Sequence, residues 1–426
     1  SNMQKDNLLK SIAEGKALEA LYGSDKAVVA AQKERYSSLV AEMQKEFGHS
    51  DAEFFSSPGR TEIGGNHTDH NYGRVLAGAV NLDNVAIATP NGSMKVNVIS
   101  RGFSRFSVDL NNLTPDKSEF YTSESLIRGV AARLKELGYQ IGGFDCIVDS
   151  GVPKGSGISS SASFEVLIGA IFSHLFNNGR LDPVLNAQIG QYAENLFFGK
   201  PCGLMDQTAC SVGGLITIDF ADPAKPIVKK VAFDFIKTGY SLVITDTGGN
   251  HADLNDEYAS LPSDMKGVAA QLGKKVLREV EPQQLIDAIP SLRGKVTDRA
   301  ILRAIHFEGD NARVAKQVEA LEKNDFNAFL QMVRESGRSS FMYNQNVYPS
   351  SAPEEQGISL ALALSDLALG SEGAFRVHGG GFAGTIQAFV PAALLERYVD
   401  MLEPTFGKGK CHKLFIRPQG SVKVEF

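Results

Sequence analysis

The sequence predicts an α+β protein of two domains. Its 426 residues suggest two or three domains of ordinary size. Hydrophobic residues make up 43% of the chain and charged residues 22%, as in ordinary globular proteins. Segments with helical periodicity and segments rich in β-branched residues both recur along the chain. These observations exclude intrinsic disorder, collagen and coiled coil as descriptions of the whole chain.

In the first half of the chain, helices are predicted both before and after a group of strands along the sequence. Residues 7–47 show a helical pattern that breaks at Gly23. Residues 73–108 are richer in β-branched residues and alternate in places, which predicts strands. Helices are expected again over residues 123–137 and 162–176.

The second half of the chain begins with short strands and continues with helices. The strands expected there are residues 215–220, 228–233 and 241–246. Residues 254–340 are predicted to be mostly helical, with Pro282 and Pro290 as helix breakers, and helix–strand alternation resumes from residue 357. The change of pattern near residue 215 predicts two domains, residues 1–215 and 216–426.

The charge balance argues against nucleic acid as a partner. Lys and Arg number 43 and Asp and Glu 49, which gives a net charge of −6 and a pI near 5.8. Proteins that bind nucleic acids in general carry a basic surface. A small anionic ligand is compatible with this balance, because a few local cations or helix N-termini suffice to bind it.

The cysteines and the longest apolar stretch favour a cytoplasmic protein. Cys146, Cys202, Cys210 and Cys411 have no zinc-like spacing and are too few for a disulfide scaffold. We therefore expect free thiols in a reducing compartment. Residues 166–176 are nearly apolar but too short to cross a bilayer, and no signal peptide is recognised. We expect no membrane partner, and the sequence does not indicate an oligomeric state.

Glycines and serines crowd residues 151–163, which read Gly-Val-Pro-Lys-Gly-Ser-Gly-Ile-Ser-Ser-Ser-Ala-Ser. Glycines let the backbone approach a ligand closely, and the start of the apolar helix expected next offers free N–H groups to a phosphate. A serine hydroxyl placed there can also bind magnesium. The alternative is an ordinary glycine turn followed by serine caps, and these residues alone leave both readings open.

Polar side chains crowd residues 58–71, which read Pro-Gly-Arg-Thr-Glu-Ile-Gly-Gly-Asn-His-Thr-Asp-His-Asn. Turn-forming residues and the small apolar surface favour a site over a core element. The alternative is an exposed polar turn. No further ligands follow the two histidines at a zinc-like interval, so a zinc site is not expected.

Two further stretches complete the set of candidate site residues. Glu194 and Asp206 stand among largely apolar neighbours, where a carboxylate needs a partner. Beside an arginine such a group stays ionised and could act as a general base, and beside a cation it could bind magnesium. The alternative is a helix-surface carboxylate or cap. Residues 377–385 hold four glycines within six positions, which indicates close approach of the backbone to a ligand or to another element.

These four stretches, in this order, resemble the galactokinases of the superfamily named after galactose, homoserine, mevalonate and phosphomevalonate kinases (the GHMP kinases). Residues 58–71 resemble the family's first signature, Gly-Arg-x-Asn-x-Ile-Gly-Glu-His-x-Asp-Tyr-Asn. Residues 153–162 resemble the second, Pro-x-Gly-x-Gly-Leu-Ser-Ser-Ser-Ala, and residues 377–385 the late glycine-rich loop. Residues 201–207 resemble the galactokinase segment Pro-Cys-Gly-Ile-Met-Asp-Gln. The resemblance runs from about residue 35 to the end of the chain.

The resemblance implies a two-lobed GHMP kinase fold, with an N-terminal lobe like domain 2 of ribosomal protein S5 and a ferredoxin-like C-terminal lobe. It implies that ATP, with Mg²⁺, phosphorylates the anomeric hydroxyl of galactose to give α-D-galactose 1-phosphate. Asp206 matches the family's catalytic base and Arg60 its transition-state stabiliser. Ser161 and Glu194 match the magnesium ligands.

The resemblance also assigns residues to the two substrates. The positions that match sugar contacts are Asn66, His67, Thr68, Asp69 and Tyr258. The positions that match ATP contacts are Ser100, Gly155, Ser156, Gly157, Ile158, Ser159, Ser160, Ser161, Gly379, Gly380 and Gly381.

The chain departs from the family pattern mainly in the first signature. Glu62 stands in place of Asn, Gly64 in place of Ile, Asn66 in place of Glu and His70 in place of Tyr, while Lys154 replaces an apolar residue of the second signature. The catalytic pair is intact, so kinase chemistry is still expected. Asn66 turns a charged acceptor into a neutral donor and acceptor, which would tolerate a carboxylate on the sugar and leaves the sugar's identity open.

Three functions fit this sequence. The first is a galactokinase, whose partners are a small sugar and ATP. The second is a kinase for a related sugar, such as arabinose, N-acetylgalactosamine or galacturonate. The third is a galactokinase-like sensor that binds sugar and ATP without turnover. The intact Arg60, Asp206, Ser161 and Glu194 argue against the sensor.

Overall fold

Helices and strands alternate through the chain. The computed structural model describes residues 2–152, 157–249 and 254–426. The helices are α1 (Asn2–Glu14), α2 (Lys16–Tyr22), α3 (Lys26–Phe47), α4 (Ser123–Glu136), α5 (Ser160–Phe176), α6 (Pro183–Tyr192), α7 (Met205–Val212), α8 (Asn255–Gln271), α9 (Pro282–Leu292), α10 (Asp298–Glu322), α11 (Phe326–Ser339), α12 (Gly357–Leu369) and α13 (Leu395–Phe406). The strands are β1 (Glu53–Gly64), β2 (Arg74–Pro90), β3 (Lys95–Ser100), β4 (Phe106–Asp109), β5 (Phe144–Ser150), β6 (Leu215–Asp219), β7 (Ile227–Val231), β8 (Tyr240–Asp246), β9 (Ala374–His378), β10 (Thr385–Pro391), β11 (Cys411–Leu414) and β12 (Val422–Lys423).

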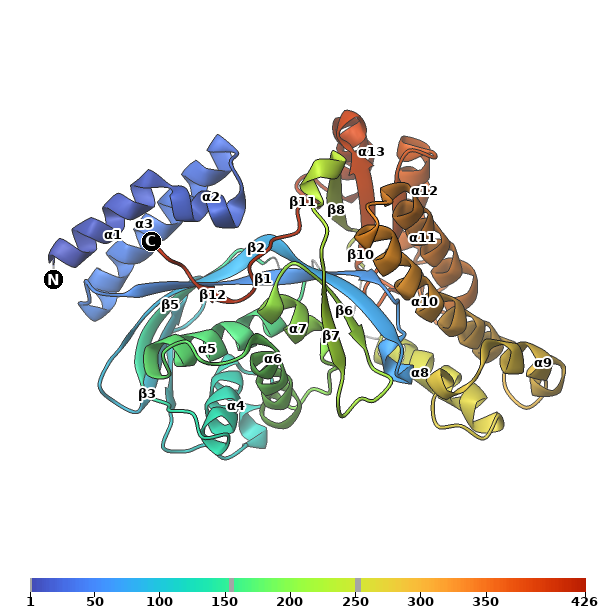
Figure 1. Cartoon of the computed structure of the whole chain (residues 1–426), viewed down its shortest axis with the longest axis horizontal. Coiled ribbons are helices and arrows are strands. Elements are labelled where there is room, and N and C mark those ends of the chain that lie inside the picture. The colour runs from blue at the N-terminus through green and yellow to red at the C-terminus, as the bar shows by residue number, and fades with distance from the viewer. Residues whose placement is uncertain (1, 153–156, 250–253) are drawn as a thin grey trace.

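Two sheets organise these elements into two lobes (Figure 1). The larger sheet has the strand order β12-β1-β2-β5-β3-β4, and the β6–β7 hairpin joins it through β2. The smaller sheet has the order β11-β8-β10-β9. Because β6 and β7 follow residue 215 and β12 lies at the C-terminal end, the larger sheet takes strands from both sides of residue 215. The division into residues 1–215 and 216–426 stays a prediction.

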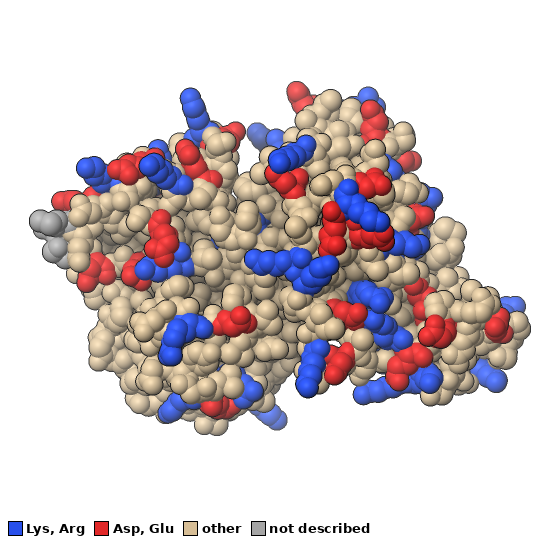
Figure 2. Space-filling view, in the orientation of Figure 1, with Lys and Arg blue, Asp and Glu red and all other residues tan. Residues whose placement is uncertain are grey.

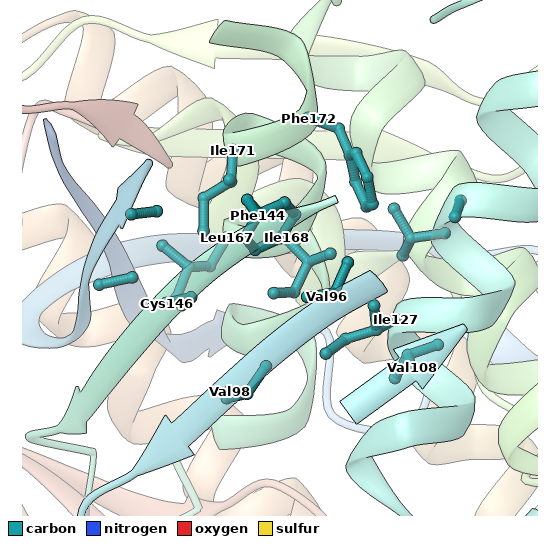
Figure 3. Close-up of a cluster of buried hydrophobic side chains, with 14 of the residues drawn as sticks. Val96, Val98, Val108, Ile127, Phe144, Cys146, Leu167, Ile168, Ile171 and Phe172 are labelled. Carbon is teal, nitrogen blue, oxygen red and sulfur yellow. The ribbon is translucent and has the colours of Figure 1, made fainter. Parts of the chain in front are cut away.

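Both faces of the larger sheet are covered by helices, which explains the apolar character of its strands. Helices α4, α5 and α6 pack on one face, where alternate strand residues such as Val96, Val98 and Cys146 meet Ile168 and Phe172 (Figure 3). Helices α1, α2 and α3 pack on the opposite face (Figure 1). The predicted helical segment 7–47 is confirmed as three helices, interrupted at Gly15 and Gly23.

The smaller sheet is also buried on both faces. Its residues Val243, Ile386 and Ala388 pack against α12 and α13, while Leu242 and Phe389 face α10 and α11. Helices α8, α9 and α10 form a separate apolar cluster beside this lobe. The helices and strands predicted for residues 123–137, 162–176, 215–246 and 254–340 are present in the described chain with small shifts at their ends.

Two details of the sequence prediction are wrong. Pro290 does not break a helix but lies in the last turn of α9, where the missing N–H removes one hydrogen bond only. The alternative of an exposed polar turn is wrong for residues 58–64, which belong to the buried strand β1. Their polar groups find partners on the other lobe, so this strand is buried without being apolar.

Asp83 on β2 ties the N-terminal helices, the larger sheet and the C-terminal tail together. Its carboxylate accepts hydrogen bonds from Arg35 on α3 at 2.8 Å and from Arg417 at 3.3 Å. The hydroxyls of Tyr22 and Ser56 donate to the same carboxylate, at 2.5 Å each. Burial opposes ionisation, but the two guanidinium groups hold the pKa of Asp83 below its usual value.

The described surface is mixed in charge. Lys and Arg side chains are interspersed with Asp and Glu over the face seen in Figure 2, without a broad patch of one sign. Among the described residues, none of the helices combines the length and the apolar character needed to cross a membrane.

We predict that Asp83→Asn destabilises the protein by about 3–5 kcal/mol, because it leaves two buried arginines without their counter-ion. The stabilisation by Asp83 is present above the usual aspartate pKa and is lost as the pH falls through the lowered one. Urea unfolding at neutral pH measures the effect. Glu319→Gln, which removes an exposed ion pair with Lys323, is the control and should leave the unfolding midpoint unchanged. Equal midpoints for the two variants would contradict this role of Asp83.

Candidate active site

A cavity of about 140 Å³ lies where β1, α7 and the loop after β9 meet. Its walls are Arg60, Glu62, His67, Asp69, His70, Gly203, Met205, Asp206, Gly379 and Gly380. The two lobes therefore both contribute to it. Six of these residues were candidates from the sequence, and they come from three separate segments of the chain.

Arg60 and Asp206 form the central ion pair of this cavity. The Arg60 Nε donates to Asp206 Oδ1 at 2.6 Å, and the arginine side chain is 9% exposed whereas that of the aspartate is 36% exposed. Burial opposes ionisation of Asp206, but Arg60 and a hydrogen bond from Ser159 hold its pKa below the usual value. An ionised aspartate in contact with the cavity is a group that can accept a proton.

The described part of the glycine-serine loop packs against this ion pair. Arg60 Nη1 donates to Gly157 O at 2.7 Å, and the Arg60 backbone N–H donates to Ile158 O at 2.9 Å. Ser159 has a left-handed backbone with φ of 63°, and α5 begins at the next residue. The candidates Gly155 and Ser156, and also Lys154, lie outside the described residues.

The segment after β1 supplies His67 and Asp69 to the cavity. His67 Nε2 donates to Gly380 O at 2.9 Å, and burial together with His70 lowers the pKa of His67 to about 4, so the ring is neutral near pH 7. The Asp69 carboxylate lies against Gly203, where a Cβ would approach its Oδ2 to 3.1 Å.

Three predicted sugar contacts are not among the cavity-lining residues. The Thr68 hydroxyl donates to Arg74 O at 2.6 Å and is buried. The Tyr258 hydroxyl donates to Gly381 O at 3.2 Å, and its ring packs edge to face on Phe382. Asn66 is also buried and is hydrogen-bonded on all sides by protein groups. Their roles toward a sugar stay predictions.

Buried polar residues of β1 join the two lobes beside the cavity, and we call these contacts the seam. Thr61 and Glu62 make them with Arg376, His378 and Gln387 on β9 and β10. Glu62 on β1 is ion-paired with Arg376 on β9, and the two side chains are 6% and 0% exposed. The Thr61 hydroxyl pairs with His378 Nε2 at 3.0 Å and accepts from Gln387 Nε2 at 2.8 Å. Burial raises the pKa of Glu62, and Arg376 and Arg60 oppose that rise.

Glu194 lies in the short π-helix Ala193–Phe198, next to a second buried carboxyl group, that of Glu165 on α5. Burial and the neighbouring Glu194 raise the pKa of Glu165 well above its usual value, and Glu165 Oε2 has no hydrogen-bond partner. Ser161 lies one helical turn before Glu165 on α5 and is exposed. Ser100, the weakest ATP candidate, ends β3 and is not a wall of the cavity.

Backbone carbonyls of the loop after β9 accept hydrogen bonds from the segment after β1 and from Asn346. Gly379 O accepts from the Asn66 amide at 2.8 Å, and Gly380 O accepts from His67 and Asn346. A Cβ on Gly381 would lie 2.0 Å from Asn346 O, so only glycine fits there.

Comparison with known proteins matches two segments of the chain to family models. The model described as "GHMP kinases N terminal domain" matches residues 125–214, and the model described as "Galactokinase galactose-binding signature" matches residues 41–90. The predicted resemblance to the galactokinases is thereby confirmed. Together with the structural likeness to a galactokinase given below, the galactokinase signature identifies a sugar kinase.

The solved structures most relevant here share the GHMP kinase fold. A Lactococcus lactis galactokinase complexed with galactose superposes with a TM-score of 0.76 at 24% identity, covering 91% of this chain and 100% of that one. A Methanococcus jannaschii mevalonate kinase superposes with a TM-score of 0.61 at 12% identity, covering 86% of this chain and 98% of that one. A Streptococcus pneumoniae phosphomevalonate kinase superposes with a TM-score of 0.56 at 13% identity, covering 85% of this chain and 98% of that one. The predicted two-lobed α+β fold is confirmed by these likenesses.

Four walls of the cavity were not among the sequence candidates: Glu62, His70, Gly203 and Met205. Glu62 and His70 stand at positions where this chain departs from the galactokinase signature, and that departure was the available signal. Gly203 and Met205 precede Asp206 within the segment 201–207 and could have been taken from it.

We predict that Gly381→Ala destabilises the protein more than Gly379→Ala does. Both glycines have a positive φ, which costs alanine about 1–2 kcal/mol. At Gly381 alone, the added Cβ would also clash with the Asn346 carbonyl oxygen, which costs about a further 1–3 kcal/mol. Urea unfolding of the two variants measures the difference, and an equal loss in both would show that the loop does not require the close approach at Gly381.

Proposed function

We propose that this GHMP kinase transfers the γ-phosphoryl group of ATP to the anomeric hydroxyl of galactose, giving α-D-galactose 1-phosphate. The observation that carries the proposal is the ionised, partly exposed Asp206 held by Arg60 at a cavity with walls from both lobes. The galactokinase signature over residues 41–90 supports galactose as the sugar.

In the proposed reaction Asp206 is the general base and Arg60 stabilises developing charge. Asp206 accepts the proton of the anomeric hydroxyl as the sugar oxygen forms a bond to the γ-phosphorus and the bond from that phosphorus to the leaving oxygen of ADP breaks. Arg60 keeps Asp206 ionised beforehand and offsets negative charge on the transferring group.

The proposed ATP site uses the loop that ends in Ser159, Ser160 and Ser161 together with residues 379–381. Helix α5 begins at Ser160, so its first N–H groups and positive end are available to phosphate oxygens. His67, neutral and bonded to Gly380, holds the second glycine loop toward the same cavity.

The residues at the proposed magnesium site fit the ion. Their donors are a hydroxyl and a carboxylate, which are ligands that Mg²⁺ prefers, and the buried carboxyl group of Glu165, whose Oε2 accepts no hydrogen bond from a donor group of the described residues, lies beside Glu194. The proposed ligands are Ser161 and Glu194. When bound, Mg²⁺ supplies charge neutralisation on the outer phosphates.

A second candidate is a kinase for a sugar that carries an additional substituent. A cavity of about 360 Å³ adjoins the first and shares Asp69, His70 and Gly203 with it. Tyr72 and Phe220 are among its further walls. This room favours testing N-acetylgalactosamine, whose acetamido group would need it, beside galactose.

We predict that Asp206→Asn lowers kcat by about 10²–10⁴-fold, because the proton acceptor is lost. MgATP affinity, measured by calorimetry, should stay near that of the wild type. The matched control is Asp219→Asn, which removes an aspartate ion-paired to Arg278 away from the cavity and should leave kcat unchanged. Near wild-type kcat in Asp206→Asn would refute the assignment of the base.

We predict that Ser161→Ala and Glu194→Gln each raise the Mg²⁺ concentration needed for half-maximal rate and lower kcat. Sugar affinity should change little, because both residues are proposed to act through the metal. Rates measured along a magnesium titration test this. If Glu194→Gln shows no shift, Glu194 has only a structural role beside Glu165.

A further inference from the structure

We infer that Glu62, and not Asn66, accepts a hydrogen bond from a sugar hydroxyl in this cavity. We further infer that the negative charge of Glu62 favours binding of neutral sugars over uronic acids. The inference rests on the proposed function, because it assigns the specificity of the same site. The family resemblance places Asn66, and not Glu62, among the sugar contacts.

Asn66 has no hydrogen-bonding capacity left for a ligand. Its amide nitrogen donates to Glu62 Oε2 at 3.1 Å and to Gly379 O at 2.8 Å, which uses both N–H groups. Its carbonyl oxygen accepts from Asn346 at 2.9 Å and from Ser340 at 3.1 Å, which uses both lone pairs. The side chain is fully buried, so its function is to connect the lobes.

Glu62 has the opposite properties. It is a wall of the cavity that also holds Arg60 and Asp206. Arg376 and Asn66 both donate to Oε2, whereas no hydrogen bond from the described residues reaches Oε1. Since Oε2 is turned to the seam, Oε1 is the free acceptor of this carboxylate.

Arg376 fixes both the charge and the position of Glu62. An arginine stays protonated in proteins, and a buried arginine without its counter-ion is costly, so the pair favours an ionised Glu62. Arg60 and Glu62 are two residues apart on β1, and alternate residues of a strand point to the same side. Arg60, which pairs with the proposed base Asp206, and Glu62, the proposed acceptor for the sugar, therefore lie on the same side of β1.

The family signature makes the same point from the sequence. The galactokinase pattern has Asn where this chain has Glu62, and Glu where this chain has Asn66. The two residues are exchanged, and they are hydrogen-bonded to each other. The exchange keeps one carboxylate and one amide in contact but moves the negative charge four positions back along the chain, onto β1.

A carboxylate at this place defines a class of substrate. Its free oxygen accepts a charge-assisted hydrogen bond from a sugar hydroxyl, which is stronger than a neutral one. A sugar that carries a carboxylate of its own would meet like charge in a buried setting. Neutral sugars are therefore favoured and galacturonate is disfavoured, contrary to the expectation drawn from Asn66 alone.

The experiment compares Glu62→Gln and Glu62→Asp with Thr61→Val. Steady-state kinetics with galactose and with galacturonate gives KM and kcat, and calorimetry gives galactose affinity without turnover. Thr61→Val is the matched control, because Thr61 makes two hydrogen bonds in the same buried seam but does not line the cavity. Thermal unfolding and MgATP affinity report whether each variant is folded.

We expect Glu62→Gln to raise KM and Kd for galactose about tenfold, with a smaller change in kcat, the increment of a charge-assisted hydrogen bond. It should also move the ratio of kcat/KM for galacturonate over galactose upward by about the same factor. Glu62→Asp keeps the charge but withdraws the carboxylate by one methylene, so KM should rise while galacturonate stays disfavoured. Thr61→Val should lose stability with KM unchanged.

If Glu62→Gln does not fold, Glu62→Asp decides the matter by itself. Wild-type KM and Kd for galactose in the folded Glu62 variants would overturn the inference while leaving the proposed function standing. Absence of turnover in the wild type with every sugar would instead overturn the proposed function, and the calorimetric comparison would still report whether Glu62 binds the sugar.

Discussion

The buried ion pair between Glu62 and Arg376 is the contact on which the site depends. It joins β1 of the larger sheet to β9 of the smaller one, across the junction of the lobes, and both side chains are almost fully buried. Removing one partner of such a pair costs about 3–5 kcal/mol. Hydrogen bonds from Thr61 and Asn66 to the C-terminal lobe extend the seam on either side of it. The Glu62–Arg376 pair and the Asn66–Gly379 hydrogen bond hold the end of β1 against β9 and the loop that follows it.

Strand β1 connects this structural seam with the proposed chemistry. Arg60 pairs with Asp206 in the N-terminal lobe, and Glu62 pairs with Arg376 in the C-terminal lobe. In the proposed reaction, one strand thus supplies both the cation that acts on the transferring group and the anion that binds the sugar. Each charge is fixed by an opposite charge in a buried setting, where electrostatic interactions are stronger than in water. Glycine is needed at 157 and 381, because a Cβ there would lie 2.8 Å from Thr385 Oγ1 and 2.0 Å from Asn346 O.

The sequence predicted the helices and the family well, and the buried polar strand poorly. Periodicity was sufficient for α3, α4 and α5, since their apolar faces repeat within each segment. Residues 58–64 were not predicted as a strand, because the partners of their polar groups lie far along the chain, as Arg376 does, and no local pattern reveals such a partner. Asn66 was assigned to the sugar from the family resemblance, which carries no information on this chain's own contacts. Only the three-dimensional contacts show that its amide is saturated and that Glu62 faces the cavity.

The identity of the phosphorylated product tests the account most directly. The protein would be incubated with galactose, ATP and Mg²⁺, and the product examined by phosphorus and proton NMR. The account predicts a new phosphate ester whose phosphorus couples to the anomeric proton, with one ADP formed for each sugar ester. A phosphate on any other hydroxyl would contradict the placement of Asp206 as base for the anomeric oxygen. ATP and galactose binding without any ester would contradict the kinase and indicate the sensor.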